Sequence, residues 1–216
     1  YNNKEGCSSS FLESIDLHIN DVLNISFIDI NQIRQKRFKI VLDTINGASC
    51  VGFKKLLKEL NCEIIHINNT PNGIFPRNPE PKTENIKQIS RLVLDNSADL
   101  AFITDPDGDR LAVIDNKGKI IIEENTLVLC VDEFLSKNKT QQQPVVSNLS
   151  TTSALSDITK KYNVQVKQTA VGEINVVEKM KSCNALIGGE GNGGVILSES
   201  HYGRDAFVAA IIILNN

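Results

Sequence analysis

Several residue types and patterns are scarce in this sequence, and each absence argues against a class of protein. Tryptophan is missing from the 216 residues, methionine occurs once, and aromatic residues make up only 5%. No stretch concentrates lysine and arginine, and the formal net charge is −3, so the basic face that nucleic acids and anionic membranes require is lacking. No apolar run approaches the roughly 18 residues of a membrane-spanning helix. We therefore expect neither a nucleic-acid partner nor a membrane partner.

The five cysteines are scattered, and no Cys-x-x-Cys pair occurs among them. This spacing suits neither a zinc site nor a disulfide framework, and it is typical of reduced thiols in the cytoplasm. We therefore expect a cytoplasmic protein. The sequence begins at Tyr1 without a methionine and stops directly after an apolar run, which favours a piece of a longer protein.

What the sequence does contain is an alternation of strand and helix patterns. Hydrophobic residues form 41% of the chain, enough for two cores. From residue 38 onward, short β-rich runs alternate with segments of helical periodicity. This pattern predicts an α/β protein with two three-layer α/β/α sandwich domains and mixed, mainly parallel sheets. We expect these domains at 38–120 and 121–216, after a connector and helix at 1–37.

The expected elements follow from these local patterns. The helices are expected at Phe11–Leu23, Gly47–Leu60, Thr83–Asp95, Asn125–Ser136, Thr152–Tyr162, Gly172–Ser182 and Arg204–Leu214. The strands are expected at Phe38–Leu42, Glu63–Ile67, Leu100–Thr104, Leu111–Ile114, Lys119–Ile122, Val145–Ser147, Val164–Lys167, Ala185–Ile187 and Val195–Leu197.

An acidic loop follows the strand expected at Leu100–Thr104. It reads Asp-Pro-Asp-Gly-Asp-Arg, with carboxylates at Asp105, Asp107 and Asp109. Three carboxylates this close repel one another unless a cation lies among them, and oxygen ligands are those that Mg²⁺ or Mn²⁺ prefers. The carboxyl end of a strand is also where open α/β sheets bind ligands. The loop therefore predicts a metal site.

Three other interpretations of the acidic loop were weighed. An EF-hand requires glycine at the sixth loop position and glutamate at the twelfth, where this loop has Arg110 and Asn116, so it is excluded. A phosphatase of the haloacid dehalogenase type would use Asp105 or Asp107 as nucleophile, but it normally has threonine or valine in place of Asp109. A solvated acidic turn requires fewer carboxylates than are present.

A glycine-rich loop, Ile187–Gly194, is the second candidate site. Its glycines allow sharp turns around Glu190 and Asn192, which could present a carboxylate and an amide to neighbouring sugar hydroxyls. The loop lacks the lysine of a P-loop, and no helix follows it as in a dinucleotide fingerprint. A plain hairpin with glycine turns is the alternative. We expect this loop and the acidic loop to face one cleft between domains that meet near residue 120.

Six segments, in the same order, resemble landmarks of the α-D-phosphohexomutases, and together they cover about residues 38–216. The strongest are the acidic loop TDPDGDR and the glycine-rich GEGNGG. The others are Asp43–Ala48, Pro71–Asn85, Thr169–Glu173 and Gly203–Ala206. The sequence is thus identified as a member of that family, represented by its second and third domains.

The resemblance implies a function. Members of this family interconvert hexose 1-phosphate and hexose 6-phosphate through a phosphoserine enzyme and a hexose 1,6-bisphosphate intermediate. By resemblance, Asp105, Asp107 and Asp109 would hold Mg²⁺, and Arg110 would act in catalysis against phosphate oxygens. The sugar would be glucose, mannose or glucosamine.

The resemblance also implies a sugar pocket formed by Glu190 and Asn192, with Gly172, Glu173 and His201 as further candidates. The family's phosphoserine loop and its phosphate-binding loop do not occur in this sequence, so its first and fourth domains would be missing and the piece alone would be inactive. A stand-alone Mg²⁺-dependent phosphatase and a non-catalytic sugar-phosphate binding module remain the alternatives.

Overall fold

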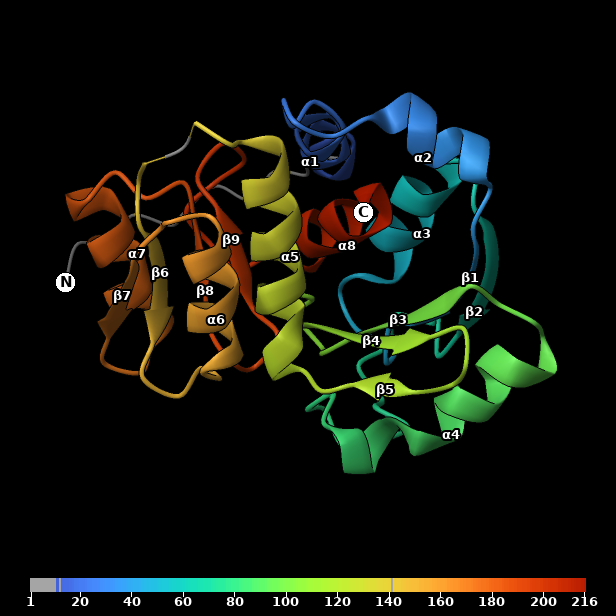
Figure 1. The fold of residues 1–216 in the computed structure, drawn as a ribbon. Coiled ribbons are helices and arrows are strands. Elements are labelled where there is room, and N and C mark those ends of the chain that lie inside the picture. The colour runs from blue at the N-terminus through green and yellow to red at the C-terminus, as the bar shows by residue number, and fades with distance from the viewer. Residues whose placement is uncertain (1–10, 12, 141) are drawn as a thin grey trace, which may run out of the picture.

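The computed structural model describes residues 11, 13–140 and 142–216, and these form two α/β domains, each with its own sheet (Figure 1). The first sheet has the strand order β2-β1-β3-β4-β5. Strands β1, β2 and β3 run parallel, whereas β4 and β5 are antiparallel additions at one edge. The strands span β1 Lys39–Asp43, β2 Glu63–Ile67, β3 Leu100–Thr104, β4 Leu111–Asp115 and β5 Ile120–Ile121.

Helices cover both faces of the first sheet. Successive side chains of a strand point to opposite faces, and β1 shows this clearly. Ile40 and Leu42 pack on the side of helix α3 (Cys50–Glu59), whereas Val41 packs on the side of helix α4 (Thr83–Asp95). Burial on both faces explains why the strand reads as a continuous apolar run rather than an alternating one.

The second sheet repeats this arrangement with the order β7-β6-β8-β9. Strands β6, β7 and β8 are parallel and β9 is antiparallel. Helix α7 (Glu173–Ser182) covers one face, while α5 (Glu124–Lys137), α6 (Ala154–Lys161) and α8 (Ala206–Asn215) lie on the other. The strands span β6 Val145–Asn148, β7 Val166–Thr169, β8 Ile187–Gly189 and β9 Val195–Leu197.

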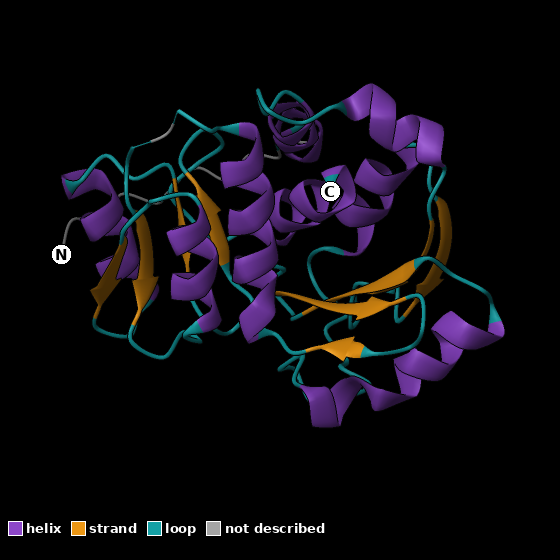
Figure 2. Ribbon diagram, in the orientation of Figure 1, coloured by secondary structure: helices purple, strands orange, loops and turns teal. Residues whose placement is uncertain are grey.

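Helix α8 lies at the centre of the molecule, with α5, α1 (Ser14–Leu23) and α3 around it (Figures 1 and 2). Nearly every residue of α8 is buried. The Phe207 ring of α8 stacks on Phe53 of α3, with ring centroids 4.9 Å apart. A helix that is apolar all round requires apolar neighbours on every side, and here both domains supply them.

The predicted fold class is confirmed: both domains are α/β with mixed, mainly parallel sheets. Some element boundaries differ. The strand predicted at Ala185–Ile187 is Ile187–Gly189, because Gly188 and Gly189 pair with β6 and β9 despite their low strand propensity. A Cβ on Gly188 would lie 2.7 Å from the Met180 sulfur, so packing excludes a side chain there.

Other boundaries are shifted by two or three residues. The helices predicted from Phe11, Gly47 and Arg204 begin at Ser14, Cys50 and Ala206, and the strand predicted at Val164–Lys167 is Val166–Thr169.

One helix was not predicted. Helix α2 (Ile30–Lys36) begins after Asp29, whose carboxylate accepts a hydrogen bond of 2.9 Å from the backbone N–H of Gln32. Its seven residues are too few for a clear helical period.

Within the part of the chain that the structure describes, no helix has the length and apolarity needed to cross a membrane.

Candidate functional site

The acidic loop lies where strand β3 ends, beside the loop that follows the neighbouring parallel strand β1. The two loops contact each other through their backbones, because Ala48 N–H donates a 2.8 Å hydrogen bond to the Pro106 carbonyl. A Cβ on Gly47 would lie 2.3 Å from that carbonyl oxygen, so only glycine allows this approach. The carboxyl ends of β1 and β3 thus fix the acidic loop from one side.

A buried ion pair fixes the acidic loop from the other side. The Arg77 guanidinium donates to Asp43 at 2.8 Å and to the Thr104 carbonyl at 2.7 Å. The side chains of Arg77 and Asp43 are only 4% and 0% exposed, so water cannot solvate either charge in place of the ion pair. Arg77 therefore ties the segment before α4 to the residue directly preceding Asp105.

The three carboxylates of the loop converge. One oxygen each of Asp105, Asp107 and Asp109 lies within 4.8 Å of the others. Burial of Asp105, together with repulsion from Asp109 and Asp107, raises its pKa to about 7. The buried Oδ1 of Asp109 has no hydrogen-bond partner among the described residues.

These features fit a hard divalent cation such as Mg²⁺. The donor set is composed of carboxylate oxygens, a cation would remove the repulsion that raises the Asp105 pKa, and Asp109 Oδ1 offers a free coordination point. Asp107 is exposed and Asp109 partly exposed, so the cation would be reachable by a ligand.

Arg110 lies against the carboxylates of the acidic loop. Its Nε is 3.5 Å from Asp105 Oδ2 and 3.7 Å from Asp109 Oδ1, with no hydrogen-bond partner of its own in the described part of the chain. Its backbone N–H donates to Asp105 Oδ1 at 3.1 Å. The guanidinium thus balances part of the loop's negative charge, and its side chain remains 26% exposed.

The glycine-rich loop connects β8 to β9 and touches the start of β4, directly after Arg110. Leu111 N–H donates to the Gly193 carbonyl at 3.1 Å. Gly193 has a φ of +94°, and a Cβ there would lie 2.7 Å from the Leu111 carbonyl oxygen. The glycine is therefore required both by backbone conformation and by close approach to the first domain.

Glu190 is buried at the base of this loop and is fully engaged. One carboxylate oxygen accepts from Asn148 at 2.7 Å and from the Gly172 N–H at 3.2 Å. The other accepts from Arg204 at 2.6 Å and from Asn192 at 3.3 Å. With 2% of its surface exposed, Glu190 can accept from a sugar hydroxyl only if one of these donors moves away. Asn192 is partly exposed, and its Oδ1 accepts a hydrogen bond of 3.2 Å from the Gly194 N–H.

Arg204 joins the two candidate loops. Its guanidinium pairs with Asp109 of the acidic loop and with Glu190 of the glycine-rich loop. Glu173 accepts a 2.9 Å hydrogen bond from the Arg204 N–H and lies 3.6 Å from Nε. Burial lowers the pKa of Arg204, but Asp109 and the two glutamates more than offset this and raise it. A single side chain thus holds carboxylates of both domains in one place.

The acidic loop opens into a cleft of about 270 Å³, and the glycine-rich loop reaches this cleft only through its contact with Arg204. The residues that line it come from the acidic loop, from the segment before α8 and from α1, and include Asp107, Asp109, Arg204, His201 and His18. The cleft is therefore lined by both acidic and basic groups.

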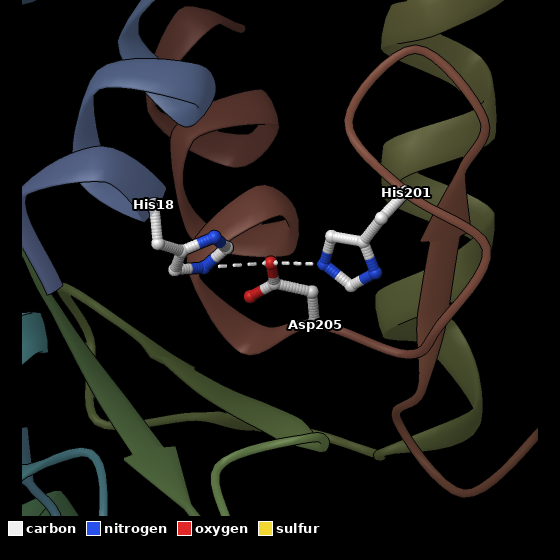
Figure 3. Close-up of side chains that lie close together, drawn as sticks. All are labelled: His18, His201 and Asp205. Carbon is white, nitrogen blue, oxygen red and sulfur yellow. Dashed lines mark hydrogen bonds and ion pairs between the residues drawn. The ribbon is translucent and has the colours of Figure 1, made fainter. Parts of the chain in front are cut away.

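Beside the acidic loop, Asp205 lies between two histidines (Figure 3). Its Oδ2 is 3.0 Å from Nε2 of His18 on α1 and 3.0 Å from Nε2 of His201 in the loop after β9. Its Oδ1 accepts from the Phe207 N–H at 2.7 Å and caps α8. These hydrogen bonds hold the pKa of Asp205 far below its usual range despite its burial, and the Asp205 bond raises the pKa of His18.

The structure brings most of the sequence-predicted site residues together around Arg204: Asp109, Glu190, Asn192, Gly172 and Glu173. His201 faces the same cleft but bonds to Asp205 instead.

Sequence reasoning missed the roles of Arg204, Asp205, Arg77 and His18. The first two lie in the segment Gly203–Ala206 and Arg77 lies in Pro71–Asn85, both recognised only as landmarks. His18 had no signal in the sequence, because its partner lies at the other end of the chain.

Comparisons with known proteins identify related domains. Residues 16–118 match the family model "Phosphoglucomutase/phosphomannomutase, alpha/beta/alpha domain II", and residues 123–216 match domain III of the same description. The first match therefore includes most of helix α1 and all of α2. A phosphoglucomutase/phosphomannomutase of Thermococcus kodakarensis is 37% identical over 179 residues, which are 82% of this chain and 39% of that protein.

Solved structures share the fold. A phosphomannomutase structure from Thermus thermophilus, described as putative, superposes with a TM-score of 0.86 at 22% identity, covering 98% of this chain and 48% of that one. An N-acetylphosphoglucosamine mutase of Aspergillus fumigatus, solved with GlcNAc-6P and magnesium, has a TM-score of 0.58 at 14% identity, covering 94% of this chain and 49% of that one. The chain thus spans less than half the length of each of these proteins.

Proposed function

This chain belongs to the phosphoglucomutase/phosphomannomutase family, and on that premise we propose that it carries the metal loop and the sugar loop of a hexose-phosphate mutase. The reaction would interconvert hexose 1-phosphate and hexose 6-phosphate. The observation that supports this most is Arg204, which pairs with Asp109 of one loop and with Glu190 of the other. A cation site and a hydroxyl-binding site must be adjacent if one ligand is to reach both.

Asp105, Asp107 and Asp109 are proposed to hold Mg²⁺, in keeping with their converging oxygens. When bound, the cation would neutralise charge on the phosphoryl group during transfer. Arg110, whose side chain is 26% exposed, would turn toward phosphate oxygens, for which a planar guanidinium is well matched. The magnesium and sugar phosphate named with the Aspergillus fumigatus structure agree with this assignment.

Asn192 is proposed to contact a sugar hydroxyl directly, since it is partly exposed whereas Glu190 is buried. Glu190 would contribute after Arg204 or Asn192 releases it, because its oxygens are engaged in the structure described here. Gly172 and Glu173 would act indirectly, by holding Glu190 and Arg204 in position. His201 would take part only after parting from Asp205. The sugar is proposed to be glucose, mannose or glucosamine.

The phosphoryl donor is proposed to lie outside these 216 residues. A Ser-His-Asn-Pro loop does not occur in the sequence, nor does an Arg-x-Ser-Gly-Thr phosphate loop. Positioning and charge neutralisation provide nearly all the catalysis of phosphoryl transfer, so the chain by itself is expected to bind but not to turn over a hexose phosphate.

The cytoplasmic location inferred from the cysteines stays a prediction.

A binding experiment tests the proposal on the chain itself. Calorimetric titration with Mg²⁺ should show weak binding that Asp107→Asn reduces by about tenfold or more, as expected when a metal site is disturbed. Asp95→Asn is the matched control, because Asp95 is exposed at the end of α4 and the whole of strand β3 lies between it and the loop. Unchanged Mg²⁺ affinity in Asp107→Asn would refute the metal assignment.

A turnover assay separates the mutase from its alternatives. The 216-residue chain and a longer protein that contains it are each given hexose 1-phosphates with glucose 1,6-bisphosphate as primer. We expect hexose 6-phosphate only from the longer protein. Release of inorganic phosphate by the chain alone would instead favour an aspartate nucleophile and a phosphatase. Binding without turnover by either protein would favour a non-catalytic module.

A further inference from the structure

The cluster of His18, His201 and Asp205 has no part in the metal loop and lies beside it in the same cleft. Figure 3 shows both imidazoles pointing at one carboxylate oxygen, from α1 on one side and from the loop before α8 on the other. Oδ2 of Asp205 is 3.0 Å from each Nε2, and the three ligand atoms lie within 4.8 Å of one another. In the described part of the chain, this cluster and the acidic loop are the only such groups of three potential ligands.

The chemistry of the two groups differs. The acidic loop offers only oxygen, which hard cations such as Mg²⁺ prefer. The cluster offers two imidazole nitrogens and a carboxylate, which suit zinc and other borderline divalent cations. Two ligand atoms bound tetrahedrally to zinc at 2.0–2.2 Å lie about 3.4 Å apart, and the observed 3.0 Å separations are close to this value.

We propose that His18, His201 and Asp205 form a second metal site, which binds Zn²⁺ or a similar borderline divalent cation through Nε2, Nε2 and Oδ2. The proposal does not depend on the mutase function. Binding requires each imidazole to give up its Nε2 proton, and a neutral imidazole can carry its remaining proton on Nδ1.

The surroundings of the cluster support a binding site. Asp205 is buried and its second oxygen is fixed by the Phe207 N–H, so the carboxylate is held in a set orientation. The side chains of His18 and His201 are 33% and 43% exposed, which lets them rotate by the small amount that a cation requires. All three residues line the cleft, so an ion can enter from solvent.

A bound cation would have two consequences. Three protein ligands leave a fourth position of a tetrahedral ion open, and here it would face the cleft that Asp107 and Asp109 also line. The ion would also fasten α1 to the start of α8, and any ligand that binds only the folded state raises its stability.

The test uses the histidine resonances of the 216-residue chain, which has only three histidines, His18, His66 and His201. Single glutamine substitutions assign the imidazole signals in ¹H–¹⁵N spectra. Zn²⁺ is then titrated in excess Mg²⁺, which occupies the oxygen-only site. We expect the His18 and His201 signals to shift together at one equivalent of Zn²⁺, with His66 unmoved.

Variants make the test quantitative. His18→Gln, His201→Gln and Asp205→Asn should each weaken Zn²⁺ binding by roughly 10- to 100-fold. The asparagine keeps an oxygen to cap α8, so that variant should still fold. His66→Gln and Asp107→Asn are the controls and should bind Zn²⁺ as the parent does.

Unmoved His18 and His201 signals would overturn the proposal, as would parental Zn²⁺ affinity in His18→Gln and His201→Gln. Loss of Zn²⁺ binding in Asp107→Asn would overturn it as well, since zinc would then occupy the acidic loop. The mutase proposal is tested separately: its metal assignment would be refuted by unchanged Mg²⁺ affinity in Asp107→Asn, whatever the Zn²⁺ results are.

Discussion

At the scale of single residues, Arg204 connects the chemistry of the two domains. It is 13% exposed and is surrounded by Asp109, Glu190 and Glu173. A buried cation among several carboxylates gains little net stability from each pair, but its removal leaves the anions without a partner. Arg204 is therefore expected to be sensitive to any substitution that removes its charge.

We predict that Arg204→Met lowers the free energy of unfolding by about 3–5 kcal/mol, because it leaves the buried carboxylate of Glu190 without its charged partner. Urea denaturation followed by circular dichroism measures the change. Arg91→Met is the matched control: the Arg91–Asp95 pair is 84% and 59% exposed, so its loss should have an effect within about 0.5 kcal/mol. Equal effects of the two substitutions would show that the Arg204 network contributes no more than a surface ion pair.

His66 makes the free energy of unfolding depend on pH. Its Nε2 lies 2.8 Å from Thr44 Oγ1, and burial, together with Lys54, lowers its pKa from 6.5 to about 4 against the opposing effect of Asp43. Above pH 6.5 the imidazole is neutral in both the folded and the unfolded chain, so no penalty arises. As the pH falls from 6.5 to 4, His66 binds a proton in the unfolded chain but not in the folded chain, and stability is lost.

The expected loss over that pH range is about 1–2 kcal/mol, after discounting because His66 is only half-buried. His66→Gln keeps a polar group near Thr44 but cannot titrate. The free energy of unfolding of parent and variant is measured by denaturation at pH 6.5 and at pH 4. Subtracting the variant's change from the parent's change removes the contribution of the carboxylates that both proteins share. Parallel pH profiles would mean that His66 protonates in the folded protein as easily as in the unfolded one.

At the scale of helices and strands, the sequence predicted what depends on local pattern. Alternating apolar runs indicated α/β domains, and the spacing of Asp105, Asp107 and Asp109 indicated the acidic loop. In both cases the signal lies in residues that are close together in the sequence. Helix α2 was missed because its start depends on the Asp29 cap and its stability on packing against α8, neither of which periodicity detects.

Residues whose partners are distant in the sequence could not be placed from the sequence. His18 meets Asp205, and Arg77 meets Asp43, only because elements fold side by side. The burial of Glu190 was also not foreseen, since a glycine-rich loop suggests exposure. Its four donors come from three separate segments and the loop itself. The position of the site was therefore predictable from motifs, but its internal hydrogen-bonding was not.

At the scale of the whole molecule, α8 makes the two domains depend on each other. One hydrophobic core extends from the α3 side of the first sheet through α8 to β9 and α5 of the second domain. Domains joined by small polar interfaces usually move and unfold separately, whereas a large apolar interface couples them. The Phe53–Phe207 stacking contact lies directly at this junction.

We therefore predict a single unfolding transition for both domains, and we expect Phe207→Ala to destabilise both. Truncation of a buried phenylalanine costs about 3–5 kcal/mol through lost burial and the cavity that remains. Hydrogen exchange with mass spectrometry reports each domain separately, so protection in β1 and in β6 should fall by similar free energies. Phe75→Ala is the control, because Phe75 is 41% exposed and should change protection little. If β6 loses protection while β1 keeps it, the domains unfold independently. In that case α8 would belong energetically to the second domain alone, despite its contacts with α1 and α3.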